Sequence, residues 1–189
     1  IVDAVNQLIS DCTFNKVDTK KIAMFDAEYI FLKIRTKSVG SKVDIKVTCP
    51  DDKETQVPVS IDLDDINVGM MEEHTNEINI TDEIKIVFKY PQLDSFTKYS
   101  TLSDTSKMVF ELTAECIEEV HFNEEVTHKV DMSKKDLDEF IDSLSTGQFT
   151  LLIKFFETMP RLRHKIEVTN PKTKVTSEVM LEGIQSFLV

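Results

Sequence analysis

The sequence has no tryptophan, 4 glycines and 5 prolines in 189 residues, and it lacks any apolar run long enough to span a bilayer. So little glycine and proline leaves almost no room for long disordered linkers, and we expect an ordered chain. No basic region followed by an apolar block opens the sequence, so we predict neither a signal peptide nor a membrane protein. The chain begins inside a predicted helix, and we therefore expect the natural N-terminus to be missing.

Cysteine and positive charge are also scarce. Three widely spaced cysteines, Cys12, Cys49 and Cys116, do not form the even, regular set of a secreted disulfide framework, which predicts reduced, intracellular folding. Apolar residues of 1–12 recur at helical spacing, and that pattern predicts Cys12 as a small core residue. The net charge of −12 argues against a nucleic-acid binder and favours a basic protein partner or simple solubility.

The segment 25–40 is predicted to form the central core helix. Between residues 22 and 34 it is apolar on almost every side, which is typical of a helix buried by the rest of a domain. At helical spacing Glu28 and Arg35 fall together on the mostly apolar side. Two interpretations remain open: a buried pair of these two side chains, or an exposed arginine whose stem lies over apolar surface.

Alternating apolar and polar residues replace the helical pattern in the middle of the chain. Segments 43–49 and 57–63 alternate with period two, and so do 78–80 and 84–88, which predicts two antiparallel hairpins. A third alternating pair lies near the C-terminus. We predict an antiparallel sheet from about residue 43 to 90, with a C-terminal hairpin at 162–181 that joins the same sheet.

Helical spacing returns after Pro91. Apolar residues share one face between Val109 and Val120, a helix capped by Ser133 follows, and a further helix runs to Pro160. The predicted architecture is a single α+β domain over residues 1–189, in which the antiparallel sheet packs against N-terminal and central helices.

Two predicted turns have related sequences. Cys49-Pro50-Asp51-Asp52 ends the first strand, and Asn170-Pro171-Lys172-Thr173 ends the first strand of the last hairpin. A pair of facing Cys-Pro-x-Cys turns would bind zinc through four thiolates. Here one of the four is present, and Asn and Thr are poor zinc ligands. We predict no metal and no cofactor, because an X-Pro pair is also typical of ordinary turns.

No catalytic pattern is visible. The four histidines form no His-Glu-x-x-His motif, and neither a Gly-x-Ser-x-Gly motif nor a phosphate-binding glycine loop occurs. The many carboxylates of segment 62–73 are typical of a solvated face. The residues thus predict a mixed α/β protein of binding or structural type and no enzyme.

Several sequence segments together resemble the baseplate protein family of T-even-like tailed phages. The segments occur in the same order as in that family and are spread over most of the chain. They are FDAEYIFLKIRTKSVG, VTCPDDKETQVPVSIDL, FKYP, FFETMPRLRH, VTNPKTK and LEGIQSF. The resemblance implies a non-enzymatic component of the baseplate central hub, needed for hub and tail assembly. It implies other hub proteins and the tape-measure protein as partners, and a location in the virion and, during assembly, in the host cytoplasm. It carries over no catalytic residue.

Two alternatives accompany this interpretation. An assembly chaperone would keep the tape-measure protein soluble and would be absent from the finished particle. A hub-associated cell-wall hydrolase would need a general acid, and Glu28 is the one acidic residue that burial on a core helix nominates. A pairing of Glu28 with Arg35 disfavours that role.

If the protein acts through its surfaces, residues at corners and ends are the candidates for partner contacts. The corner at 38–40, the turn at 158–163 with two arginines predicted to be exposed, and the apolar tail supply them. We expect Phe187→Asp to leave the protein folded but to weaken partner capture. The full set of contact candidates is Arg35, Ser38, Gly40, Arg161, Arg163, Phe187 and Leu188.

Overall fold

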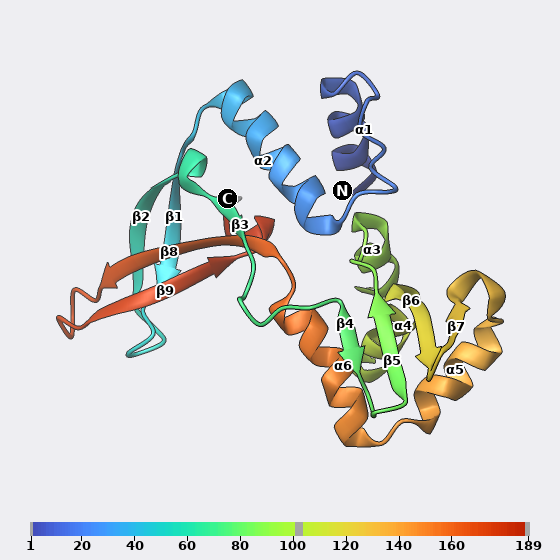
Figure 1. Cartoon of the computed structure of the whole chain (residues 1–189). Helices are drawn as coiled ribbons and strands as arrows, with labels where there is room; N and C mark the ends of the chain where they lie inside the picture. Colours follow the sequence, from blue (N-terminus) through green and yellow to red (C-terminus); the bar gives the residue numbers. More distant parts are fainter. Residues whose placement is uncertain (1, 101–103, 188–189) are drawn as a thin grey trace. The chain divides into compact units, whose positions relative to one another are not determined.

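The computed structural model describes residues 2–100 and 104–187, and Figure 1 traces the chain. The chain divides into two compact units: unit 1 contains residues 3–69 and the residues from Pro160 onward, and unit 2 contains residues 70–159. Both units combine helices with antiparallel strands, which confirms the predicted α+β class. The prediction of a single domain remains a prediction.

The strands form three antiparallel sheets in the described part of the chain, with orders β1-β2, β3-β8-β9 and β4-β5-β6-β7. The prediction of one continuous sheet, with the C-terminal hairpin joined to it, is therefore wrong. Alternation specifies which face of each strand is buried, and a short turn specifies its hairpin partner, but neither determines which hairpins share a ladder. The predicted hairpins themselves are confirmed.

Unit 1 surrounds helix α2 with two small sheets. Its elements are α1 (Val2–Cys12), α2 (Met24–Val39), β1 (Lys42–Thr48), β2 (Gln56–Asp62), η1 (Leu63–Asp65), β3 (Asn67–Gly69), β8 (Arg161–Thr169), β9 (Thr176–Glu182) and η3 (Ile184–Phe187). Helix α1 is confirmed, but its buried residue is Ile9, whereas Cys12 is exposed and not the predicted core residue. Helix α2 ends where Gly40 adopts a φ of 100° and donates its N–H to Thr36 O at 3.1 Å.

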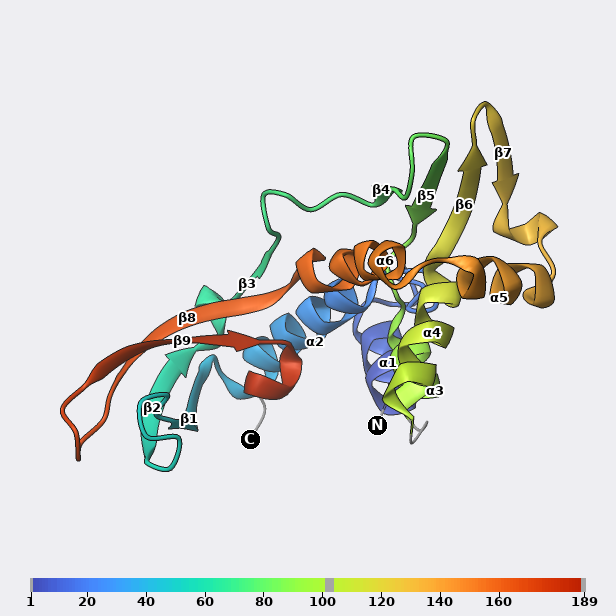
Figure 2. The same cartoon turned by 90° about the horizontal axis from the view of Figure 1, so that it is seen from below.

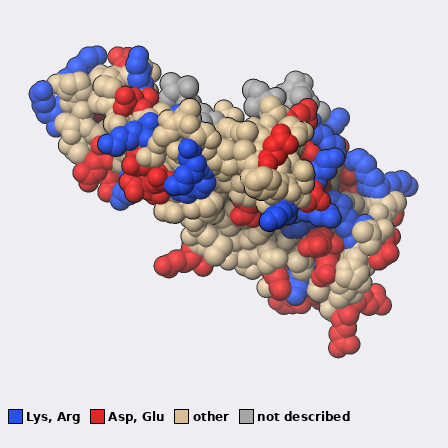
Figure 3. All heavy atoms as spheres, turned by 90° about the horizontal axis from the view of Figure 1, so that it is seen from above, with Lys and Arg blue, Asp and Glu red and all other residues tan. Residues whose placement is uncertain are grey.

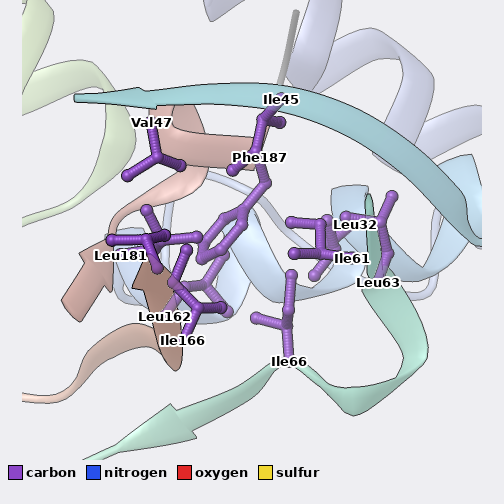
Figure 4. Packing of buried hydrophobic residues seen from close by; sticks show 11 residues of the cluster. Leu32, Ile45, Val47, Ile61, Leu63, Ile66, Leu162, Ile166, Leu181 and Phe187 are labelled. Carbon is purple, nitrogen blue, oxygen red and sulfur yellow. The ribbon is translucent and has the colours of Figure 1, made fainter. Parts of the chain in front are cut away.

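The core of unit 1 lies between α2 and the two sheets. Figure 4 shows Leu32 of α2, Ile45 of β1 and Leu181 of β9 directed toward the ring of Phe187. Leu32 and Phe187 are 0% exposed. Burying a side chain of this size stabilises a fold by about 1.5–3 kcal/mol, so this shared contact holds η3 and α2 against the sheets.

In its described residues, unit 2 combines a four-stranded sheet with four helices. Its elements are β4 (Glu77–Asn79), β5 (Ile84–Phe88), α3 (Leu93–Ser100), α4 (Thr105–Cys116), β6 (Ile117–Phe122), β7 (Glu125–His128), η2 (Lys129–Asp131), α5 (Lys134–Ser143) and α6 (Thr146–Thr158). The predicted cap at Ser133 is confirmed as part of a capping box with Asp136. Ser145 and Gln148 form a second one at the start of α6.

The predicted helix at 109–120 ends early. Helix α4 stops at Cys116, and the next residue, Ile117, begins strand β6, which pairs with β5. The amino group of Lys129 closes the helix by donating to Ala114 O at 2.8 Å and Glu115 O at 2.5 Å. Pairing with a strand about 30 residues earlier thus overrides a helical spacing that continues locally.

Aromatic rings fill the core of unit 2. Phe155 of α6 stacks on Phe88 of β5 with centroids 4.7 Å apart, and on Tyr90 at 5.6 Å. Ile86 and Ile117, from neighbouring strands, belong to the same buried cluster. The apolar face of the sheet is therefore covered by α6. No helix in the described ranges is both long and apolar enough to cross a bilayer.

Candidate functional site

The two Pro-containing turns predicted from sequence adopt the same local structure. In the β1–β2 turn, Lys53 donates its N–H to Cys49 O at 2.9 Å and has a φ of 57°. In the β8–β9 turn, Lys174 donates to Asn170 O at 2.9 Å and has a φ of 65°. The sequence correspondence between the turns is thus a structural one.

The turns are joined directly by side chains, which we call the turn clamp: Asp51, Asn170 and Thr173. Asn170 Nδ2 lies 3.1 Å from both carboxylate oxygens of Asp51, and Thr173 Oγ1 donates to Asp51 Oδ2 at 2.5 Å. Asn170 is 0% exposed, and its Oδ1 accepts the N–H of Lys172 at 2.9 Å. Hydrogen bonds from Thr173 and Asn170 lower the pKa of Asp51.

The other two positions of the zinc-like pattern are Asp52 and Cys49, both in the β1–β2 turn. Asp52 accepts the N–H of Thr55 at 2.9 Å and its hydroxyl at 2.5 Å, and these bonds lower the Asp52 pKa well below its usual range. Cys49 is buried, and burial raises the pKa of its thiol. The described residues contain no group of three or more His, Cys, Asp or Glu side chains that could hold a metal ion.

Glu28 and Arg35 do not pair. Arg35 is partly exposed, and its Nη1 donates to Gly40 O at 3.3 Å, so this arginine contacts the end of its own helix. Glu28 accepts the N–H of Ile184 at 3.5 Å. Burial raises the Glu28 pKa, and this hydrogen bond and the charge of Arg161 oppose the shift. The hypothesis of a buried pair is wrong, because α2 has a solvent-facing side at Arg35.

Among the contact candidates, Ser38 and Gly40 are exposed, as their proposed role requires. Next to them Val39 is 75% exposed, a large apolar side chain at a helix end. Arg161 and Arg163 were predicted to be exposed in a turn but lie in strand β8, beside Glu182 of β9. The Arg163 side chain retains only 16% of its accessibility, so its predicted exposure is wrong.

The apolar tail packs on the body of unit 1. Phe187 is completely buried in the core, so it cannot contact a partner while unit 1 is folded, and its assignment as a contact residue is wrong. The apolar content of the tail predicted that it would be covered, but it did not distinguish packing on the protein's own body from docking on a partner. Leu188 lies outside the described residues.

A polar cluster that sequence reasoning missed lines a cavity of about 370 Å³ in unit 2. Tyr99 donates its hydroxyl to Glu115 Oε2 at 2.5 Å, and Lys98 Nζ lies 3.3 Å from the same oxygen. Lys134 pairs across the rim with Glu111 and Asp138 at 3.2 and 2.9 Å. The sequence offered no signal for this cluster, because its members come from α3, α4 and α5.

A histidine joins the loop before β4 to the rest of unit 2. His74 Nδ1 lies 2.9 Å from Thr158 Oγ1, and Nε2 lies 3.0 Å from the hydroxyl of Tyr90. The Thr158 hydroxyl also donates to Lys154 O at 2.9 Å, and this arrangement is compatible with a neutral ring that donates from Nδ1 and accepts at Nε2. Burial lowers the His74 pKa, which favours this neutral form.

Charge is distributed unequally between the units. Residues 70–159 contain 19 Asp and Glu against 8 Lys and Arg, whereas the rest of the chain contains 15 against 14. Unit 2 therefore has a net charge of −11 and unit 1 a net charge of −1. On the face drawn in Figure 3 both signs are interspersed with uncharged surface.

Comparison with protein-family models gives a match over the whole chain. The family model described as T4 bacteriophage base plate protein matches residues 1–189. Searches of curated proteins and of solved structures return no match.

Proposed function

Because this chain belongs to the family of T4 bacteriophage base plate proteins, we propose that it is a component of the baseplate central hub, needed to assemble the hub and the tail. The family match over the whole chain supports a place in the baseplate, and the resemblance of the sequence segments to the family with a hub subunit supports the hub assignment. The chain then acts in the phage tail through protein–protein contacts, with other hub proteins and the tape-measure protein as its partners. It reaches that place through the cytoplasm of the infected host.

The charge distribution supports a role in binding. A net charge of −11 on unit 2 favours a basic partner and raises the rate at which such a partner is encountered. Unit 1 is close to neutral and exposes Val39 at its 38–40 corner, which suits a different, less charged contact.

The polar clusters support a role without catalysis. In the turn clamp, Asp51 is held by Asn170 and Thr173, and in unit 2 Glu115 is held by Tyr99 and Lys98. These bonds join separate elements of each unit and account for the placement of the carboxylates. Lysis of cell-wall material by the purified protein, abolished by Glu28→Ala with the fold retained, would overturn the non-enzymatic proposal.

Depletion of the protein during infection tests the proposal. We expect baseplate wedges to accumulate and complete tails to be missing, because the wedges lack a hub on which to assemble. Normal numbers of complete tails would contradict the proposal. Under the chaperone alternative, depletion would instead leave the tape-measure protein aggregated, and extra soluble tape-measure protein supplied with an unrelated chaperone would restore tails.

A further inference from the structure

The β6–β7 hairpin presents an unpaired strand edge. Strand β7 pairs with β6, and no other strand within the described ranges pairs with it. All four residues of β7 are exposed, and in Figure 2 the hairpin projects from its unit with the turn in the open. Alternate residues of an antiparallel edge direct their N–H and C=O groups outward, so β7 offers a template for another strand.

The hairpin is held in shape before any partner arrives. The carboxylate of Glu119 on β6 lies 2.8 Å from His121 Nε2 and 3.2 Å from His128 Nδ1 on β7. The contact with His128 fastens the edge strand to β6, and the contact with His121, within β6, holds the Glu119 carboxylate in place. A preformed edge loses little conformational entropy when a strand is added to it.

The charge around this edge has one sign. Residues 117–131 contain five Asp or Glu and a single lysine, Lys129. The amino group of Lys129 is directed inward, toward the two carbonyls at the end of α4. Lysine is the charged residue that most often hinders strand addition at an edge, and here none faces outward; the remaining charges are acidic and hinder the addition of another acidic strand. Exposed carboxylates, including Glu124 and Glu125 at the turn, take that place.

Apolar side chains are interspersed with these acids. Phe122 is 50% exposed, Val126 is 46% exposed and Val130 is 91% exposed. Together with the strand edge they supply the contacts that a bound strand uses: main-chain hydrogen bonds for affinity and alternate side chains for specificity.

We propose that the free edge of β7 binds an extended, basic segment of a neighbouring baseplate protein by strand addition, with lysine or arginine alternating with apolar residues. This inference rests on the proposed function and adds to it the binding site and the chemistry of the partner. The acidic residues around this edge favour a basic partner over the other candidates. A second copy of this chain would bring like charges together at the edge, and nucleic acid is repelled by the same carboxylates.

A synthetic peptide of alternating lysine and valine, about eight residues long, tests the site in the full-length protein. We expect it to bind and to slow amide hydrogen exchange at alternate residues of β7. A peptide of alternating glutamate and valine should do neither. Equal binding of both peptides, protection confined to another strand, or a concentration-dependent dimer of the free protein that buries β7 would each overturn the proposal.

Charge reversal separates this inference from the proposed function. Glu124→Lys with Glu125→Lys should weaken binding of the lysine peptide about tenfold at low salt, and less at high salt. The matched control is Asp142→Lys with Glu157→Lys, which changes the charge of unit 2 equally on exposed helical positions and should leave binding unchanged. Failure of the wild type to capture any baseplate protein from infected cells would contradict the proposed function. If the wild type and the Glu124/Glu125 variant capture baseplate proteins equally, the proposed binding site on β7 is wrong, but the proposed function is not affected.

Discussion

The side-chain amide of Asn170 donates to both carboxylate oxygens of Asp51 at 3.1 Å, across 119 positions of sequence. This contact ties the end of the β1–β2 hairpin to the end of the β8–β9 hairpin within unit 1. It occupies the place between two turns where a paired-turn zinc site would hold its metal. Hydrogen bonding among Asp51, Asn170 and Thr173 thus performs the cross-linking that a metal ion provides in such sites.

Replacing Asn170 should weaken unit 1. Asn170→Ala removes a completely buried amide and leaves the N–H of Lys172 and the carboxylate of Asp51 without that partner. We expect the free energy of unfolding to fall by about 1–3 kcal/mol, measured by urea denaturation. Asn67→Ala is the control, since the Asn67 amide makes its bond to Asp65 O at the exposed surface. Equal effects of the two variants would contradict a structural role for the clamp.

The clamp also predicts a dependence on pH. The pKa of Asp51 is lowered from 3.8 in the folded protein, so the ionised carboxylate stabilises the fold above that value, and this contribution is lost as the pH falls through the lower, folded pKa. The urea midpoints of wild type and Asp51→Ala should therefore differ most above about pH 5 and converge below pH 3.8. A difference that stays constant in acid would show that the charge of Asp51 does not matter.

The tail residue Phe187 should behave as a core residue. Phe187→Ala is expected to lower the free energy of unfolding by about 3–5 kcal/mol, and Phe187→Asp to unfold unit 1, because the ring is completely enclosed. Phe14→Ala serves as the matched control: its ring is 82% exposed, and its change should stay within about 0.5 kcal/mol. Circular dichroism during thermal melting measures both. A folded, stable Phe187→Asp variant would contradict the core assignment and would show that the tail is a surface segment.

Local sequence patterns predicted the elements better than their assembly. The β1–β2 hairpin follows from alternation, because one face of each strand is buried, and the start of α5 follows from the capping box at Ser133. Segment 117–120 could not be assigned locally. Ile117 and Val120 lie three residues apart, which fits one face of a helix better than one face of a regular strand, and pairing with β5 through a shift of register overrides that spacing.

The sequence predicted the two turns of the candidate site but not the contact between them. The two turns could be matched by their Pro residues, but the zinc-like pattern pointed to Asp52, whereas Asn170 reaches the neighbouring Asp51. Asp52 is bonded within its own turn. Choosing between adjacent aspartates requires the distance between turns, which no spacing along the chain provides. Likewise, the unpaired edge of β7 follows from sheet order, which the sequence did not give.

The three free cysteines should differ in reactivity. Cys12 is exposed, whereas Cys49 and Cys116 are buried, and burial raises the pKa of Cys116 to about 12. Since the thiolate is the reactive form, a thiol reagent should modify Cys12 in the native protein and the other two after unfolding. Mass spectrometry of the labelled protein measures this. Fast labelling of Cys116 under native conditions would show that the core of unit 2 opens readily.

Mass spectrometry of purified mature tails tests the central proposal most directly. A hub component should be present in every preparation, in a fixed ratio to other baseplate proteins, and chemical cross-links should join it to them. Its absence from mature tails, combined with abundance in infected cells, would contradict the hub proposal and favour a chaperone that leaves before the particle is complete.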